Sequence, residues 1–270
     1  MNELLKQVID IARQAGDSIM AIYNTDFSQF EKADKSPLTA ADLSAHHIII
    51  DALNLISDFP CLSEESDELE VQWAKRKNWN TYWLIDPLDG TKEFISKNDE
   101  FTVNIALIED GKPVLGVVYC PPLERFYFAA QGVGAYRQNV NKDPVSIKLG
   151  ETPIKTQPWK IVGSRRHGAV ALEEFSKQLG NVEVVSMGSS LKICLVAEGA
   201  AHIYPRLAPT CEWDTGAAQA IVEIAGGHIL TPDLSPLLYG QKESLLNPCF
   251  IVCESLNEDW KSTFVKLSKL

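Results

Sequence analysis

Residues 82–94 read YWLIDPLDGTKEF. The apolar run over residues 82–85 predicts a buried strand. We expect this strand to end at Asp86, because Pro87 has no backbone N–H to donate to a neighbouring strand. Gly90 then permits a backbone conformation that other residues avoid. The stretch therefore predicts a strand that runs into a tight loop.

This loop carries oxygen ligands and free amides. Asp86 and Asp89 supply two carboxylates, with the carbonyl of Leu88 between them, and hard oxygen donors of this kind suit Mg²⁺. Thr91 opens a short helical segment, whose free backbone N–H groups favour a phosphate oxygen. The alternative is an ordinary turn, because Asp-Pro and Asp-Gly pairs are common turn formers.

Two further acidic sites lie elsewhere in the chain. Glu64 and Glu65 sit in an acidic stretch, and Asp214 is expected in the first turn of a buried helix. Taken singly, the two glutamates are typical of a solvated surface. The aspartate, taken singly, could simply stabilise the positive end of the helix dipole. Together, three acidic sites at element edges could hold two divalent ions about 4 Å apart, which activate water and clamp a phosphate.

The remaining pattern predicts two halves. Helical periodicity covers residues 2–23 and 39–57, and four strands over 82–129 predict an antiparallel meander. From Thr152 onward, strands and helices alternate. We therefore predict an α+β half over residues 1–150, which carries the metal and phosphate loop, and an α/β half over 151–270, which completes the site.

Composition excludes several classes of protein. The chain has 270 residues and a net charge of −11, which argues against binding to nucleic-acid phosphates. The first residues lack the pattern of a secretory signal, and no apolar run is long enough to span a membrane. Six cysteines without a CxxC pair favour a reducing cytoplasm. No Walker A, GxGxxG, GxSxG or HExxH string occurs, which argues against the enzyme classes that carry them.

The acidic strings occur in a recognisable order: Glu64-Glu65, Asp86-Pro87-Leu88-Asp89-Gly90-Thr91, and Trp213-Asp214 with Ala217. In order and spacing they resemble the motif set of the inositol-monophosphatase-like, lithium-sensitive phosphatase superfamily, over nearly the whole chain. Three further strings resemble its branch of 3'(2'),5'-bisphosphate nucleotidases: Lys92-Glu93-Phe94, Gly188-Ser189-Ser190-Leu191-Lys192 and Glu243-Ser244-Leu245-Leu246-Asn247-Pro248. Inositol monophosphatases usually carry Thr-Asn-Phe at the first of these.

The resemblance implies a layered αβαβα sandwich of the inositol monophosphatase and fructose-1,6-bisphosphatase type, with two or three Mg²⁺ ions. The ligands it implies are Glu64, Asp86, the carbonyl of Leu88, Asp89 and Asp214. It pairs Asp42 with Thr91 to orient and deprotonate the attacking water, with Glu64 as a further catalytic residue. Because water is the nucleophile, no covalent phosphoenzyme is expected.

The same resemblance implies hydrolysis of the 3'-phosphate of adenosine 3',5'-bisphosphate to AMP and phosphate, and of its sulfated analogue, in sulfur assimilation. The substrate contacts it implies are Glu64, Leu88, Asp89, Gly90, Thr91, His167, Ser190, Lys192, Arg206 and Asp214. Lys192 and Arg206 are the candidates for the second phosphate, because a polyanion bound to an acidic protein needs local positive charge.

Two other functions stay open. One is an inositol monophosphatase or a broad sugar phosphatase, and the other is a non-catalytic phosphate-binding module, against which the complete acidic set argues. We expect a monomer that acts on a small nucleotide in the cytoplasm, without nucleic acid or a transmembrane segment. Peripheral association with the cytoplasmic face of the inner membrane is left open.

Overall fold

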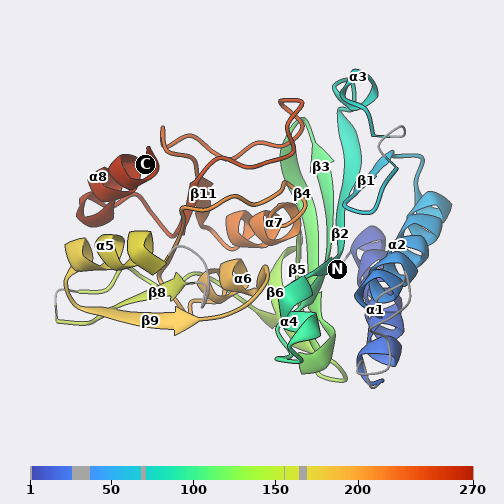
Figure 1. Cartoon of the computed structure of the whole chain (residues 1–270), viewed down its shortest axis with the longest axis horizontal. Coiled ribbons are helices and arrows are strands. Elements are labelled where there is room, and N and C mark those ends of the chain that lie inside the picture. Colours follow the sequence, from blue (N-terminus) through green and yellow to red (C-terminus); the bar gives the residue numbers. More distant parts are fainter. Residues whose placement is uncertain (1, 26–36, 68–70, 155, 164–168, 270) are drawn as a thin grey trace.

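Residues 81–89 form the second strand of a seven-stranded sheet (Figure 1). The computed structural model describes residues 2–25, 37–67, 71–154, 156–163 and 169–269. The strands of this sheet lie in chain order: β1 (Cys61–Ser63), β2 (Thr81–Asp89), β3 (Thr102–Glu109), β4 (Lys112–Cys120), β5 (Arg125–Ala130), β6 (Gly134–Asn139) and β7 (Val145–Ser146). All neighbouring pairs are antiparallel except β1 and β2, so the predicted meander is confirmed.

A second sheet of five strands forms from the C-terminal half of the chain. Its order is β11 (His228–Leu230), β12 (Phe250–Cys253), β10 (Ile203–Arg206), β8 (Trp159–Gly163) and β9 (Val182–Ser186). Strands β8, β9 and β10 are parallel, as alternation with helices predicts, and β12 pairs antiparallel with β10 and β11.

Helices separate and cover the two sheets. They are α1 (Glu3–Tyr23), α2 (Pro37–Ile56), α3 (Trp73–Arg76), α4 (Thr91–Ile95), α5 (Ala169–Leu179), α6 (Leu191–Ala197), α7 (Gly216–Ile224) and α8 (Glu258–Leu267). A short 3₁₀ turn, η2 (Pro121–Leu123), joins β4 to β5. Helices α1 and α2 cover the outer face of the first sheet, α6 and α7 lie between the sheets, and α5 and α8 cover the second (Figure 1). This is the predicted αβαβα sandwich.

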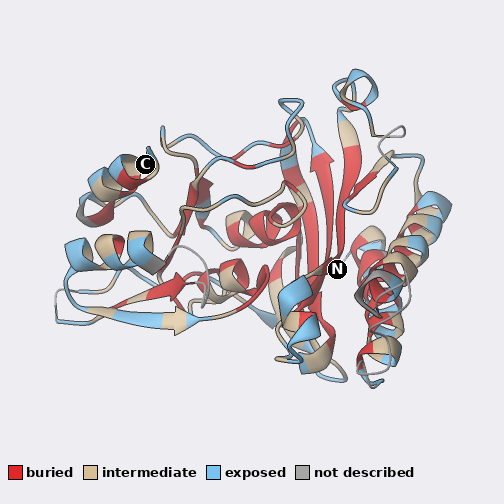
Figure 2. Cartoon of the chain, viewed as in Figure 1, coloured by how far each residue is buried: buried red, intermediate tan, exposed pale blue. Residues whose placement is uncertain are grey.

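The middle layer is buried between the two sheets. Seven consecutive residues of α7, from Gly216 to Val222, are buried, because both sheets cover this helix (Figure 2). A Cβ on Gly116 of β4 would lie 2.2 Å from the carbonyl oxygen of Ala217, so glycine is required for this close approach. The packing holds the residues just before α7 against the end of β2.

The structure corrects several expectations. Strand β2 continues beyond Asp86 to Asp89, through a register shift in its pairing with β3. Asp214 precedes α7 and lies in a turn, two residues before the first helical residue. Sequence patterns also missed β1, β6, β7, β11, α3 and α8. None of the described helices is long and apolar enough to cross a membrane.

The buried face of α2 also differs from the expected one. The sequence predicts a face over Leu43, His46, His47, Ile50, Leu53 and Ile56. From residue 40 onward, where the structure describes the side chains of this helix, the buried residues are Ala41, Asp42, Ala45, Ile49 and Leu53. The true face is narrower and lined with alanine, because α2 packs closely against α1. It also carries Asp42 into the interior.

Candidate active site

A β-bulge gives the aspartates of β2 a common direction. Asp86 pairs with Asn104 and Asp89 pairs with Thr102, so β2 has one residue more than β3 over this interval. In a regular strand, residues three apart point to opposite faces, and an extra residue reverses that relation. Gly90 follows with φ of +98°, a left-handed conformation that turns the chain into α4. The bulge therefore lets both carboxylates face one site.

Three carboxylates meet at this point. Asp86, Asp89 and Asp214 each offer one oxygen, and these oxygens lie within 4.8 Å of one another. Oδ1 of Asp86 accepts a hydrogen bond from the N–H of Leu88 at 3.1 Å, while its buried Oδ2 has no hydrogen-bond partner. Asp214 comes from the turn before α7, where its Oδ2 accepts from the N–H of Cys211 at 2.8 Å.

Asp89 is fixed by residues from both sheets. Its Oδ2 accepts from the N–H of Ser190 at 2.5 Å and lies 3.5 Å from the side chains of Thr102 and Asn104. The hydroxyl of Ser190 is in turn 2.8 Å from Thr102 Oγ1 and from Asn104 Oδ1. Ser190 is the residue immediately before α6, so Asp89 joins the first sheet to the middle layer.

Burial and mutual repulsion oppose ionisation of these groups. Burial raises the pKa of Asp86 well above its ordinary value, and the charges of Asp89, Glu64 and Asp214 add to the rise. Burial, with the charge of Asp89, raises the pKa of Asp214 to about 7. Burial also raises the pKa of Asp89, although the charge of Lys192 and the hydrogen bond from Ser190 counter it. The cluster thus needs positive charge to be fully ionised at neutral pH.

Glu64 and Asp42 lie beside this cluster. Glu64 follows β1 and is exposed as a whole residue, but protein atoms surround its carboxyl group. This burial of the carboxyl, with the charge of Asp89, raises its pKa to about 7. Asp42 is 8% exposed, and its Oδ1 is buried without a partner. Burial and the charges of Glu65 and Glu64 raise the pKa of Asp42 to about 8. The structure therefore brings Asp42, Glu64 and the three aspartates into one acidic region.

The remaining predicted residues are distributed as follows. Thr91 is the first residue of α4 and is exposed, and the structure shows no hydrogen bond between it and Asp42, both of which it describes. The side chain of Leu88 is buried in the core beneath α1 and α2, and no contact fixes the role of its carbonyl. His167 lies outside the described residues. The pairing of Asp42 with Thr91 stays a prediction.

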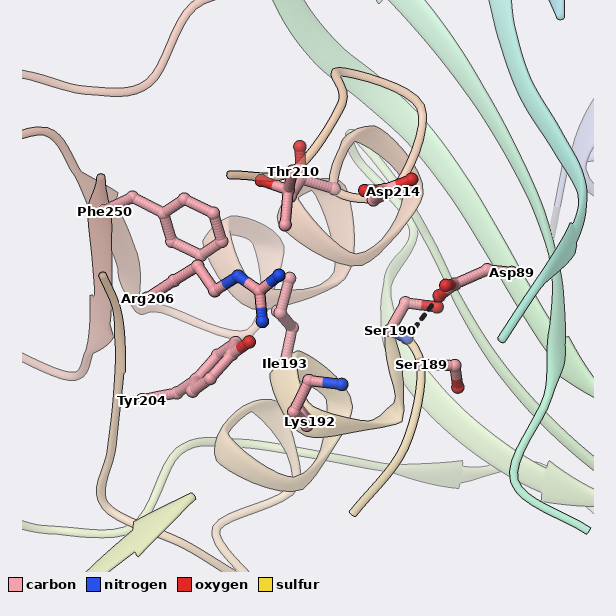
Figure 3. A pocket seen from close by; sticks show the side chains of 11 residues that line it. Asp89, Ser189, Ser190, Lys192, Ile193, Tyr204, Arg206, Thr210, Asp214 and Phe250 are labelled. Carbon is pink, nitrogen blue, oxygen red and sulfur yellow. Dashed lines mark hydrogen bonds between the residues drawn. The ribbon is translucent and has the colours of Figure 1, made fainter. Parts of the chain in front are cut away.

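A pocket connects the aspartates to two cations. Five of its lining residues were predicted as site residues from the sequence: Asp89, Ser190, Lys192, Arg206 and Asp214. The sequence did not predict the other six: Ser189, Ile193, Tyr204, Thr210, Thr215 and Phe250. Figure 3 shows the amine of Lys192 and the guanidinium of Arg206 facing the same space, across from the carboxylates of Asp89 and Asp214. Arg206 donates from Nε to the carbonyl of Ala208 at 3.0 Å and from Nη2 to that of Pro209 at 2.9 Å.

One signal in the sequence could have revealed further site residues. Thr102 and Asn104 alternate with Phe101, Val103 and Ile105 in a strand that is buried over most of its length. Polar side chains on a buried face need hydrogen-bond partners, so their positions mark a polar site at that face. By contrast, the local sequence around Tyr204 and Phe250 gives no such indication.

Comparison with known proteins identifies the family of the chain. The model of the inositol monophosphatase family matches residues 1–266. The chain belongs to this family. Among curated relatives, the 3'(2'),5'-bisphosphate nucleotidase CysQ of Escherichia coli strain K12 is 46% identical over 252 residues, 92% of this chain and 99% of the relative. The protein of the same name from Haemophilus influenzae is 38% identical, over 98% of each chain.

Solved structures of the inositol monophosphatase family share the fold. The structure of CysQ from Bacteroides thetaiotaomicron matches with a TM-score of 0.84 and 43% identity, over 93% of this chain and 97% of its own. Inositol monophosphatase II of Staphylococcus aureus has a TM-score of 0.78 over all of both chains, at 22% identity, which supports the fold alone.

The donor set of this family member fits a divalent cation. All the side-chain donors in the cluster are carboxylate oxygens, which are the ligands that Mg²⁺ and similar hard ions prefer. The buried Oδ2 of Asp86 has no other partner, and a buried acceptor without one is costly. A bound cation would satisfy this oxygen and offset the repulsion among the three aspartates.

We expect the stability of the metal-free protein to fall as pH rises from 5 to 9. The folded-state pKa values of Glu64 and Asp214, about 7, and of Asp42, about 8, exceed the ordinary values of 4.5 and 3.8. The protonated forms therefore favour folding; their contribution is complete below about pH 4 and is lost as pH rises through 7 and 8. Thermal unfolding in EDTA should show this decline in Tm, and added Mg²⁺ should reduce it. An equal decline with and without Mg²⁺ would contradict the assignment.

Proposed function

We propose that this chain is a Mg²⁺-dependent 3'(2'),5'-bisphosphate nucleotidase that hydrolyses adenosine 3',5'-bisphosphate to AMP and phosphate. One observation carries the proposal: the pocket has an acidic end, with Asp89 and Asp214, and a basic end, with Lys192 and Arg206. The acidic end suits a metal-assisted reaction at one phosphate, and the basic end suits a second phosphate on the same substrate. The names of the relatives with 38–46% identity support this choice.

Asp86, Asp89 and Asp214 would hold the cation, with Glu64 and the carbonyl of Leu88 completing a site for two or three Mg²⁺ ions. When bound, the ions supply positive charge to the phosphoryl oxygens and make water more acidic. The amides that follow Gly90, at the start of α4, face the region of the transferred phosphate in this proposal. Gly90 and Thr91 would thus position the group that is attacked.

Asp42 and Thr91 would move the proton of the attacking water. The buried Oδ1 of Asp42 has no hydrogen-bond partner in the structure, so the ionised carboxylate is available to accept a proton. The hydroxyl of Thr91 can relay the proton toward it. The water oxygen then bonds to phosphorus as the bond to the 3'-oxygen breaks. The 3'-oxygen takes up a proton from solvent to become the hydroxyl of AMP, and phosphate is released without a covalent enzyme intermediate.

Lys192 and Arg206 would bind the 5'-phosphate. The two hydrogen bonds from Arg206 to Ala208 and Pro209 hold its guanidinium at the pocket wall before substrate arrives. Ser190, which holds Asp89, would line the sugar between the two phosphates. The sulfated analogue of the substrate carries the same 3'-phosphate and is expected to react in the same way.

Phosphate release from adenosine 3',5'-bisphosphate and from inositol 1-phosphate tests the proposal. With Mg²⁺ we expect a strong preference for the nucleotide, and inhibition by added Li⁺, because the two phosphates match the two ends of the pocket. A preference for inositol 1-phosphate would overturn the role of Lys192 and Arg206 and favour an inositol monophosphatase. Binding of the nucleotide without turnover would favour a phosphate-binding module.

The same proposal covers the cellular compartment and the oligomeric state of the enzyme. All six cysteines are free thiols, and their number and burial suit a reducing cytoplasm. We propose that the enzyme acts as a monomer, which size-exclusion chromatography with light scattering can test. Whether the enzyme associates with the cytoplasmic face of the inner membrane can be tested by sedimentation with vesicles.

A further inference from the structure

The segment over residues 242–248 pairs with the chain just before Asp214. The N–H of Glu212 donates to the carbonyl of Leu245 at 2.8 Å, and the N–H of Asn247 donates to that of Thr210 at 2.8 Å. Cys211 and Leu246 form the antiparallel bridge between these two bonds. The string ESLLNP, which no step of the proposed reaction uses, is therefore attached to the loop that presents Asp214.

Asn247 adds side-chain contacts to this pairing. Its side chain is buried, and Nδ2 lies 2.7 Å from the carbonyl oxygen of Cys211, 3.0 Å from Oγ1 of Thr215 and 3.2 Å from Oγ1 of Thr210. Cys211 and Thr215 are the two ends of the turn that carries Asp214. One buried amide thus joins both ends of this turn.

The same turn holds the carboxylate of Asp214. The N–H of Cys211 donates to Oδ2 of Asp214 at 2.8 Å, and the N–H of Asp214 donates to the carbonyl of Cys211 at 3.2 Å. The peptide groups on both sides of Cys211 therefore contact Asp214, and Asn247 contacts the carbonyl of this residue directly. A shift of Cys211 would move the carboxylate relative to Asp86 and Asp89.

We propose that Asn247 is a positioning residue for Asp214, which sets the geometry of the cation site from outside it. This inference rests on the proposed role of Asp214 as a metal ligand. Replacement of a group that orients a metal ligand, without touching the ion, usually lowers metal affinity by roughly 10- to 100-fold. The structure assigns this task to the buried amide of the ESLLNP string.

Titration of the metal-free protein with Mg²⁺ by calorimetry tests the proposal. We expect Asn247→Ala to weaken Mg²⁺ binding by roughly 10- to 100-fold, because the ends of the turn lose their common partner. The matched control is Phe264→Leu, which trims a fully buried side chain of α8 in the core of the second sheet, away from the turn that carries Asp214. It should lower Tm by a comparable amount and leave Mg²⁺ affinity within about threefold of the parent chain. Equal weakening in both variants would overturn the proposal.

Substitutions at the other end of the turn keep the test decisive if Asn247→Ala does not fold. Thr215→Val removes the hydroxyl that lies 3.0 Å from Nδ2 of Asn247, together with its bonds to the carbonyl of Glu212 and the hydroxyl of Tyr239, whereas Thr215→Ser retains all three. We expect weaker Mg²⁺ binding in the first and near-parental binding in the second. Tyr239→Phe keeps the contact of Thr215 with Asn247 and loses the bond from Tyr239, so it should bind Mg²⁺ as the parent chain does. Loss of affinity in both threonine variants, or in neither, would contradict the proposal.

A third variant distinguishes this inference from the function on which it rests. Asp214→Asn removes the charge of the proposed ligand but keeps the turn. If Asp214→Asn weakens Mg²⁺ binding and Asn247→Ala does not, the positioning role fails alone. If Asp214→Asn binds Mg²⁺ as the parent chain does, the ligand assignment itself fails.

Discussion

Replacement of Asp86 with asparagine should lower phosphatase activity by about a thousandfold and yet raise the Tm of the metal-free protein. A catalytic metal supplies several kcal/mol of transition-state stabilisation, and about 1.4 kcal/mol corresponds to tenfold in rate. Without metal, however, Asp86 is a fully buried acid whose pKa is raised by burial and by Asp89, Glu64 and Asp214. The neutral amide removes this repulsion and still accepts from the N–H of Leu88.

The measurement compares thermal unfolding of Asp86→Asn and the parent chain in EDTA and in saturating Mg²⁺. In EDTA the variant should be the more stable by a few degrees. In Mg²⁺ the order should reverse, because only the parent chain gains the full free energy of ion binding. A matched control is Asp233→Asn, an exposed aspartate whose carboxylate bonds Thr231 and Ser235 away from the site. A variant that is less stable than the parent chain under both conditions would contradict the repulsion argument.

Replacement of Arg206 with methionine should reduce kcat/KM for adenosine 3',5'-bisphosphate by roughly 10- to 100-fold. A hydrogen bond between charged partners contributes about 1.5–3 kcal/mol, which corresponds to this range. Adenosine 3'-monophosphate lacks the second phosphate, so its kcat/KM should change by less than about threefold. We expect Lys192→Met to affect both substrates, because the charge of Lys192 is the main influence that counters the rise in the pKa of Asp89. The charge of Arg206 also lowers the pKa of Asp214, but more weakly than the other groups that act on that carboxyl.

Steady-state kinetics of both substrates with each variant provide the measurement. Arg137→Met is a suitable control. Arg137 lies on β6, forms an ion pair with Glu198 at 2.8 Å and does not line the pocket. Equal losses on the two substrates in Arg206→Met would show that Arg206 supports the fold of its loop rather than the second phosphate. Unchanged kinetics on the bisphosphate would remove Arg206 from the substrate site.

Most elements could be predicted from the sequence because their patterns are local. The periodicity of α1 and the turn signals at Asp110-Gly111 and Pro121-Pro122 depend only on neighbouring residues. The αβαβα order came from resemblance to a family, whereas the acidic sites were visible in the sequence itself and the resemblance assigned them as ligands. The structure places Asp86, Asp89 and Asp214 together. The strings of the sequence thus predicted the residues of the cluster, although they could not give its geometry.

The features that escaped prediction depend on distant partners. The continuation of β2 through Pro87 requires the extra residue opposite β3, which is visible only in the pairing. Strand β1 has three residues and is defined by its parallel pairing with β2. The role of Asn247 depends on contacts more than thirty residues away in the chain, with Cys211 and Thr215. Non-local pairing of this kind leaves little trace in the sequence around each residue.

The bond between Asp89 and Ser190 joins the first sheet to the start of α6, and Asp214 reaches the same point from the turn before α7. A cation held there would be shared by segments that are more than a hundred residues apart in sequence. Its binding energy would then act on the unfolding of the whole chain as one cooperative transition, rather than on a local loop. Removal of the ion would accordingly expose both halves together to proteases, instead of releasing one surface segment.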